Sequence, residues 1–352
     1  MAVSDLLAQL ARLKRFFSVS ELLAQMSTMK RARAPLRGYL TTVCFWSLQD
    51  VGAMARLADG RRATLEELAE PGRLDPRILG FVCTYLRRLG YLEGDAESVG
   101  LSPSGRRFWR DCAPVLELFR GYQPLFDSLG AELRGEARFG EDLFRREDSV
   151  ARAFSELGRG FIFPIMAQIL EGEGVRRMVE LGCAEAELCR FVCERVPSFR
   201  CLGIDSSAKV VAAAQSRVAH AGLADRIEVI QGDIFRIDVV PGDLESYAAV
   251  TAIDLFHGFL LDGEKGLVEM FRGLRARFPS QLFLISEICL PSETRMRAIA
   301  YPNVEHELFH GLSHQQSFKR GQLEALLGEA GWRVERTWQL NELAGRVFAL
   351  AR

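Results

Sequence analysis

The stretch from Met178 to Glu187 reads MVELGCAEAE, and it decides the fold of this chain. An apolar run ends in the acid Glu180, and a turn of small residues begins at Gly182. A helix-like stretch, LCRFVCERV, comes next, and a second apolar run, CLGI, then ends at Asp205. This order indicates a strand, a turn, a helix and a strand that cradle a nucleoside. Small residues let the backbone approach such a ligand, and the acid accepts hydrogen bonds from ribose hydroxyls.

The totals of the chain exclude several classes of protein. Its 352 residues suggest about two domains, and a hydrophobic content of 48% is ample for a packed core. The 45 basic and 46 acidic residues leave a net charge of −1, which gives no general attraction to nucleic acid or anionic membrane. No apolar run reaches the roughly 18 residues that span a bilayer. The eight cysteines contain no Cys-x-x-Cys pair. We therefore expect a reduced cytoplasmic protein that binds neither nucleic acid nor membrane.

The first part of the chain, residues 1–113, looks helical and ends in a small hairpin. Its opening residues, MAVSDLLAQLARLKRFF, are amphipathic and predict a packed helix. Glu67 follows Thr64 by three positions, which is a capping-box pattern, and Pro76 opens another helix. The stretch SVGLSPSGRRFW then predicts a wing. Helices followed by a wing indicate a winged-helix domain, for which we expect dimerisation rather than DNA binding.

The pattern of the chain changes near Val175. Residues 114–174 hold two or three more helices, which we interpret as a helical linker or lid. In residues 175–352 short apolar runs alternate with helix-like segments, which is typical of an α/β fold with a mainly parallel sheet. The last stretch, WRVERTWQLNELAGRVFALAR, holds two strand-like runs without a helix between them. It predicts an antiparallel hairpin at the sheet edge.

Three landmarks of a cofactor site occur in order in this α/β part. The turn after Glu180 would back an amino-acid group, Asp205 would bind ribose, and Asp233 would accept from an adenine amino group. No Lys or Arg lies near the first turn until Arg190, so a pyrophosphate is not favoured there. The pattern therefore predicts S-adenosylmethionine rather than NAD. The expected cofactor contacts are Glu180, Gly182, Ala184, Asp205, Gly232, Asp233, Ile234 and Asp254.

On these motifs the chain resembles the class I S-adenosylmethionine-dependent methyltransferases. It is most similar to the small-molecule methyltransferases with an N-terminal winged-helix dimerisation domain. The resemblance implies a Rossmann-like sheet, a homodimer and a small-molecule substrate. One feature departs from the family, whose first turn usually reads Gly-x-Gly-x-Gly, whereas Ala184 and Ala186 stand at the second and third positions here. If both positions need a positive φ, each alanine costs about 1 kcal/mol or more. The alternative is a degenerate site that no longer binds the cofactor.

Four of the five histidines gather near the end of the chain. His257 follows the strand-like run AAVTAI, which places it at the carboxyl edge of the sheet, where ligands bind in such folds. His306, His310 and His314 are spaced by four, so they share one face of a helix.

The resemblance gives His257 two competing roles. In the O-methyltransferases of this architecture, a histidine just after the fourth strand is the general base. In the 2-oxo acid C-methyltransferases of this architecture, a histidine there and another about fifty residues on hold iron or zinc. The second ligand would then be His310, since 310 − 257 = 53. We prefer the metal, because two histidines from separate segments suit a cation that also holds substrate oxygens.

The preferred function is therefore C-methylation of the β-carbon of a 2-oxo acid in secondary metabolism, with the metal stabilising an enolate. The alternative is an O- or N-methyltransferase of an aromatic or natural-product acceptor, with His257 as base. Glu287, near a strand end, would be a third oxygen donor, a base or a helix cap. Arg146 is our candidate for a fork that binds a substrate carboxylate.

Overall fold

The computed structural model describes residues 18–70, 72–95, 97–240, 243–296, 303–340 and 345–352. The chain divides into two compact units, Met1–Leu116 and Glu117–Arg352. The amphipathic helix expected at the N-terminus lies outside the described residues, and the division into three functional parts stays a prediction. Within the described ranges, no helix is both long and apolar enough to cross a bilayer.

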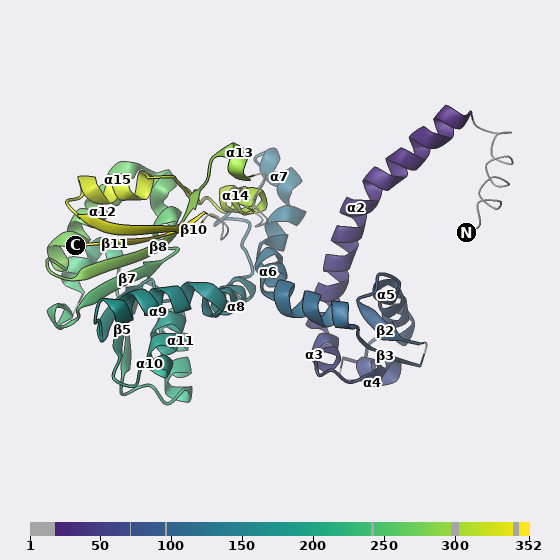
Figure 1. Ribbon diagram of the computed structural model, residues 1–352, viewed down its shortest axis with the longest axis horizontal. Helices are drawn as coiled ribbons and strands as arrows, with labels where there is room; N and C mark the ends of the chain where they lie inside the picture. Colours follow the sequence, from purple (N-terminus) through teal and green to yellow (C-terminus); the bar gives the residue numbers. More distant parts are fainter. Residues whose placement is uncertain (1–17, 71, 96, 241–242, 297–302, 341–344) are drawn as a thin grey trace. The chain divides into compact units, whose positions relative to one another are not determined.

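The first unit consists of helices and one small sheet (Figure 1). Thr64 and Glu67 form the expected capping box, in which each side chain accepts from the other's backbone N–H. Asp75 caps the helix that opens at Pro76. A hairpin is present, but only its second strand, Ser98–Leu101, lies in the stretch that predicted the wing, because the first strand precedes that stretch at Leu92–Gly94. The second strand also pairs with a short strand at Ala63–Thr64. The elements are α2 (Val19–Asp50), α3 (Ala53–Ala58), β1 (Ala63–Thr64), α4 (Leu65–Ala69), α5 (Pro76–Arg88), β2 (Leu92–Gly94), β3 (Ser98–Leu101) and α6 (Pro103–Asp127), whose last residues belong to the second unit.

The second unit begins with helices and continues as an alternation of strands and helices. Its helical elements are α7 (Leu129–Leu133), α8 (Glu147–Leu157), η1 (Gly158–Ile162), α9 (Phe163–Gly172), α10 (Glu187–Arg195), α11 (Ala208–His220), η2 (Ile234–Val239), η3 (Leu244–Ser246), η4 (Phe256–Asp262), α12 (Glu264–Arg277), α13 (Glu293–Met296), α14 (Asn303–Leu312) and α15 (Gln322–Glu329). Its strands are β4 (Arg177–Leu181), β5 (Arg200–Asp205), β6 (Ile227–Gln231), β7 (Ala249–Ile253), β8 (Leu282–Leu290), β9 (Phe318–Lys319), β10 (Val334–Leu340) and β11 (Arg346–Ala351).

The strands of the second unit form one mixed sheet in the order β10-β11-β8-β7-β4-β5-β6, with β9 paired to β8. The pairs among β4 to β8 are parallel, whereas β11 runs antiparallel to β8 and to β10. The predicted hairpin at the sheet edge is therefore confirmed. Because β4 lies between β5 and β7, the strand order reverses there, and in open α/β sheets ligands bind at the carboxyl ends of the strands at such a point.

Helices cover both faces of this sheet (Figure 1). On one face, α9, α10 and α11 pack over a core that includes Met178 and Phe199. On the other face, α12 and α15 pack over a second core that includes Val179 and Phe283. All five residues of β7 are buried, as expected for a parallel strand that is covered on both sides. The α/β fold that the apolar alternation predicted is thus observed.

Candidate active site

The turn after β4 adopts the backbone conformation that a glycine-rich turn would have. Gly182, Ala184 and Ala186 have φ angles of 64°, 46° and 59°, so both alanines are left-handed. A Cβ on Gly182 would lie 2.7 Å from the end of the Leu255 side chain, which would have to shift to make room for it. Ala186 caps α10 in this conformation. The turn therefore keeps the shape of the family's pattern, at the energetic cost that alanine carries in the left-handed region.

Two acids flank this turn. The carboxylate of Glu180 is buried and accepts hydrogen bonds from the backbone N–H and the thiol of Cys189, on α10. Burial raises the pKa of Glu180 to about 7. The carboxylate of Asp205, at the end of β5, accepts from the backbone N–H groups of Ala184 and Ser207 at 3.1 and 3.0 Å. Glu180 thus joins strand to helix, and Asp205 joins the end of β5 to the first turn.

The third landmark follows β6. A Cβ on Gly232 would lie 2.8 Å from Ile204, so the chain passes closely over the end of β5. Asp233 is exposed, and its side chain caps η2 by accepting from the N–H of Phe235 at 2.9 Å. Ile234 is buried in the apolar core on the α12 face. The predicted adenine contacts of Gly232, Asp233 and Ile234 stay predictions.

These landmarks fit S-adenosylmethionine because they meet at one end of the sheet. The register pairs Leu181 with Ile204 and Asp205 with Gln231, so the first turn, Asp205 and Gly232 lie at the carboxyl ends of three adjacent strands. Asp254 follows the next strand, with a φ of 47°, but both its carboxylate oxygens accept from the guanidinium of Arg346, at 2.7 and 2.8 Å. Its predicted contact with the cofactor stays a prediction, and its observed partner is an arginine of β11.

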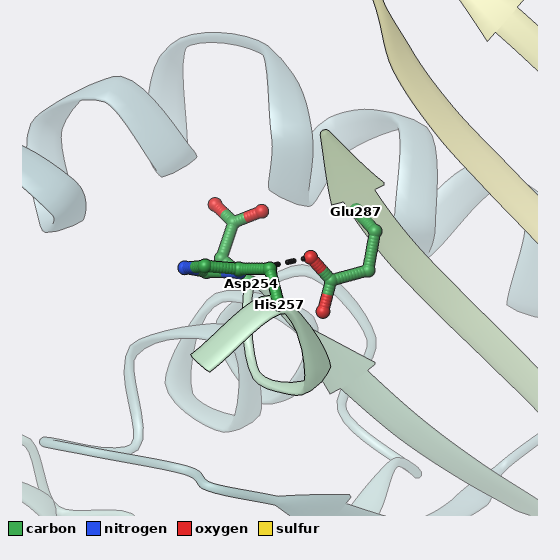
Figure 2. Close-up of side chains that lie close together, drawn as sticks. All are labelled: Asp254, His257 and Glu287. Atoms are coloured by element: carbon green, nitrogen blue, oxygen red, sulfur yellow. Dashed lines mark hydrogen bonds and ion pairs between the residues drawn. The ribbon is translucent and has the colours of Figure 1, made fainter. Parts of the chain in front are cut away.

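The ring of His257 is held by Glu287 at the same sheet edge (Figure 2). Nδ1 of His257 lies 3.0 Å from Oε2 of Glu287, and an ionised carboxylate only accepts, so the ring donates from Nδ1. The other oxygen of Glu287 accepts from the backbone N–H groups of Leu255 and Phe256, at the start of η4. Burial is the largest effect on the pKa of His257 and lowers it, but the charge and hydrogen bond of Glu287, together with the charge of Asp254, outweigh burial, so the pKa lies above its ordinary value. Nε2 of His257 is left as the ring's acceptor.

Two further imidazoles lie beside His257, from α14. The rings of His257 and His310 are 5.0 Å apart between centroids, and those of His310 and His306 are stacked at 3.7 Å. Nδ1 of His310 donates to the backbone carbonyl of His306, so Nε2 of His310 is also an acceptor. Burial, and then the neighbouring His257 ring, lower the pKa of His310 to about 3. The structure thus brings together the two histidines that the sequence paired, and it adds His306. The helix face predicted for all three histidines of this series is wrong for His314, because α14 ends at Leu312 and His314 follows it, exposed and with a left-handed φ of 52°.

The fit of a metal ion can be tested on these donors. Asp254, His257 and Glu287 each offer an atom within 4.8 Å of the others. Both oxygens of Asp254 accept hydrogen bonds from Arg346. The oxygens of Glu287 accept from two backbone amides and from the His257 ring. The donor atoms of these three residues are therefore already used in hydrogen bonds, which makes the trio a poor cation site. Within the described ranges, the Nε2 atoms of His257 and His310 have no hydrogen-bond partner, so this pair is the better candidate for a metal. Among the described residues, no carboxylate or thiol completes a three-residue ligand set with that pair.

The arginine near the imidazoles is not the expected one. Arg146 is exposed, and its backbone N–H bonds the carbonyl of Gly121. The half-buried arginine is its neighbour Arg145, which donates to the hydroxyl of Tyr122 at 3.0 Å and whose charge helps to lower the pKa of His310. The role predicted for Arg146 stays a prediction. The sequence gives no signal for Arg145, Tyr122 or Arg346, because only long-range packing places them.

Comparisons with known proteins agree with this geometry. Residues 178–277 match a family model described as a methyltransferase domain. An uncharacterised protein of Synechococcus sp. (strain ATCC 27144 / PCC 6301 / SAUG 1402/1) is 27% identical over 115 residues, which make up 33% of this chain and 27% of the relative. The match thus spans about a quarter of the length of that relative.

Solved structures match nearly the whole chain. The mitomycin 7-O-methyltransferase MmcR has a TM-score of 0.70 at 18% identity, over 94% of this chain and 99% of that chain. The N,N-8-amino-8-demethyl-D-riboflavin dimethyltransferase RosA from Streptomyces davawensis has a TM-score of 0.65 at 20% identity, over 96% and 99%. CalO1, a methyltransferase in calicheamicin biosynthesis in its SAH-bound form, has a TM-score of 0.62 at 17% identity, over 94% and 98%. Residues 178–277 are thus similar to a methyltransferase domain, and nearly the whole chain has the fold of these solved methyltransferases.

Proposed function

We propose that the chain transfers a methyl group from S-adenosylmethionine to an oxygen or nitrogen atom of a small natural-product acceptor, with His257 as the general base. One observation carries this proposal: the hydrogen bond from Nδ1 of His257 to Glu287 leaves Nε2 as an acceptor at the carboxyl edge of the sheet. The names of similar structures support it, since MmcR is named as an O-methyltransferase and RosA as a dimethyltransferase of an amino group. The proposal replaces our preference for C-methylation, which now takes second place.

The cofactor's contribution would be an electrophilic methyl group next to the acceptor. The turn at Gly182 and the carboxylate of Asp205 would hold its amino-acid and ribose parts. Nε2 of His257 would accept the proton of the acceptor's O–H or N–H group as that atom forms its new bond to the methyl carbon. The bond from that carbon to sulfur would break in the same step, and S-adenosylhomocysteine would leave. The carboxylate of Glu287 would stabilise the imidazolium that results, and its bonds to two backbone amides keep it in place.

The test is methyl transfer by the whole chain from radiolabelled S-adenosylmethionine to a panel of phenols, aminophenols and 2-oxo acids. We expect the wild-type chain to transfer the labelled methyl group to an oxygen or nitrogen atom of the acceptor. The His257→Ala variant should lose this transfer. Label that enters only the β-carbon of 2-oxo acids would contradict the proposal. So would transfer that is indifferent to His257→Ala.

The second candidate is metal-assisted C-methylation of a 2-oxo acid. The observation that favours it is the pair of unbonded Nε2 atoms on His257 and His310, whose Nδ1 atoms are both held by oxygen acceptors. Such outer bonds are typical of histidines that bind a metal. The ion, iron or zinc, would act as a Lewis acid on the keto group. Metal analysis of the purified protein, with activity before and after chelation, separates this candidate from the first.

The partner that we propose for the chain is a second copy of itself, through the first unit. The helix α2 exposes a series of large apolar side chains along its length, although such side chains are usually covered. A homodimer would cover them, and a substitution such as Leu36→Asp should shift the mass measured by light scattering toward the monomer. We propose a cytoplasmic location and neither nucleic acid nor membrane as partner. The exposed residues are Leu23, Met26, Met29, Leu36, Tyr39 and Leu40.

A further inference from the structure

A groove lies at the end of the sheet opposite to the cofactor turn, and we call it the amino-end groove. Its volume is about 650 Å³, and its walls include the first residues of β4, β5 and β6, which are Arg177, Arg200 and Ile227. Tyr247, just before β7, also lines it. None of the residues that we assign to methyl transfer is part of this lining, so the proposed function leaves the groove without a role.

Three arginines line the amino-end groove, and their observed partners carry no negative charge. The guanidinium of Arg177 lies over the ring of Tyr247, 4.8 Å from its centroid. Arg200 donates to the backbone carbonyl of Asp225 at 2.7 Å. Arg226 donates to backbone carbonyls at and just after the end of α10. Within the described ranges, these guanidinium groups are thus bound by carbonyl oxygens and a ring, and their positive charges have no carboxylate counterion.

Arg177 and Arg200 repel each other because of the sheet register. They are register partners in the parallel pair of β4 and β5, so their side chains leave the same face of neighbouring strands. Like charges at directly opposite positions destabilise a sheet. The acids Asp225 and Glu228 also line the groove, but against three arginines they leave an excess of one positive charge. A bound anion would remove this repulsion.

We propose that the amino-end groove binds a phosphate group through Arg177 and Arg200. Two neighbouring guanidinium groups can each donate a pair of hydrogen bonds to phosphate oxygens, and the ring of Tyr247 holds one of them in place. Both arginines are exposed, so a ligand in solution can reach them. A groove of this volume has room for the phosphomonoester of a small molecule as well as for free phosphate.

The experiment titrates glycerol 3-phosphate into the full-length protein by calorimetry, at pH 8 and constant ionic strength. We expect wild type to bind it, and Arg177→Met and Arg200→Met each to bind at least about tenfold more weakly, because each loses a charge-assisted pair of bonds. Arg200→Lys keeps the charge without the fork and should lie between. Arg272→Met, on an exposed arginine of α12, is the matched control and should bind as wild type does.

Urea unfolding of the same proteins tests the repulsion and the folding of the variants. Without ligand, Arg200→Met should unfold cooperatively at a urea concentration no lower than that of wild type, because the like-charge pair is gone. Glycerol 3-phosphate should raise the midpoint of wild type and of Arg272→Met, but not that of Arg177→Met or Arg200→Met. Inorganic phosphate and glycerol are titrated in parallel. Tighter binding of the ester than of free phosphate would assign the groove to phosphomonoesters, and equal binding would assign it to the free anion.

Several outcomes would overturn the inference. Wild type that binds neither phosphate compound would do so, as would equal binding by wild type, Arg177→Met and Arg200→Met. A loss in Arg272→Met as large as that in Arg200→Met would show general attraction of anions to a charged surface. Glycerol that binds as tightly as its phosphate would show that the charge is not recognised. A lower urea midpoint of Arg200→Met without ligand would contradict the repulsion. None of these results depends on methyl transfer or on His257.

Discussion

The carboxylate of Glu287 accepts a hydrogen bond from Nδ1 of His257, across 30 positions of sequence and a distance of 3.0 Å. The same carboxylate accepts hydrogen bonds from two backbone amides at the start of η4. One fully buried side chain therefore fixes the backbone at the start of η4 and also the tautomer of the His257 ring. The orientation of His257 is therefore a property of the sheet, because Glu287 belongs to β8. This relationship leads to the first prediction.

Replacement of Glu287 by glutamine should abolish the base while leaving the chain folded. The amide oxygen can still accept from the backbone, but its NH₂ group would then face Nδ1 and force the ring proton onto Nε2. We expect kcat to fall roughly 10²- to 10⁴-fold with KM little changed, as for removal of a general base. The reduction of kcat in His257→Ala should lie in the same range. Glu269→Gln, on the exposed side of α12, is the matched control. Wild-type kcat in Glu287→Gln would contradict the proposed tautomer.

Replacement of His310 by alanine should separate the two candidate mechanisms. If His257 acts alone as the base, His310→Ala should lower kcat/KM by no more than about tenfold, since only hydrogen bonding and packing are lost. If the two rings share a metal, His257→Ala and His310→Ala should both be severe, and bound metal should disappear from each. We expect the mild result. Steady-state kinetics and elemental analysis of the same preparations decide between them.

Loss of Arg346 should destabilise the sheet edge. The Asp254 carboxylate is 16% exposed and has both oxygens on this guanidinium, so Arg346→Met would leave a nearly buried charge without its counterion. We expect the free energy of unfolding in urea to fall by about 3 kcal/mol. The double variant Asp254→Asn with Arg346→Met should recover part of that loss, because asparagine carries no charge and tolerates the φ of 47°. If the double variant recovers none of the lost stability, the unpaired charge of Asp254 is not the cause of the loss.

The alanines in the first turn should weaken the chain without preventing cofactor binding. Ala184 is exposed and left-handed, so Ala184→Gly removes strain without removing any packing. We expect a gain of up to about 1 kcal/mol in the free energy of unfolding, because the flexibility of glycine in the unfolded state offsets part of the relief. S-adenosylhomocysteine should bind wild type and this variant in calorimetry. Absence of binding to wild type would support a degenerate site.

The stability of the chain should depend on pH through Glu180. Its pKa in the folded protein is about 7, above the 4.5 that is usual for glutamate, because the carboxylate is buried. Its contribution to stability is therefore complete below about pH 4.5 and is lost as the pH rises through 7. Glu180→Gln cannot ionise, so relative to wild type it should gain up to about 3 kcal/mol between pH 5 and pH 8. Urea titrations at both pH values test this, with Glu269→Gln as the exposed control. A pH-independent difference between Glu180→Gln and wild type would refute the shift.

Much of the fold was predictable because its signals are local. The acid, the small-residue turn and the apolar runs around Gly182 lie within a few residues, and they indicate a strand that turns into a helix. The capping box at Thr64 and the terminal hairpin are local in the same sense. The cofactor edge also follows from sequence, since the carboxyl ends of parallel strands lie together whatever side chains they carry.

The chemistry of the site depends on tertiary structure. Sequence spacing paired His257 with His310 and favoured a metal over a base, but the choice depends on which ring nitrogens are already bonded, and only the tertiary structure decides that. Only the pairing of β7 with β8 brings Glu287 to His257, and only the antiparallel placement of β11 brings Arg346 to Asp254, 92 positions away. Strand motifs determine which end of the sheet binds ligands. The direction of each side chain there depends on contacts between segments that are distant in the chain, and no local pattern contains them.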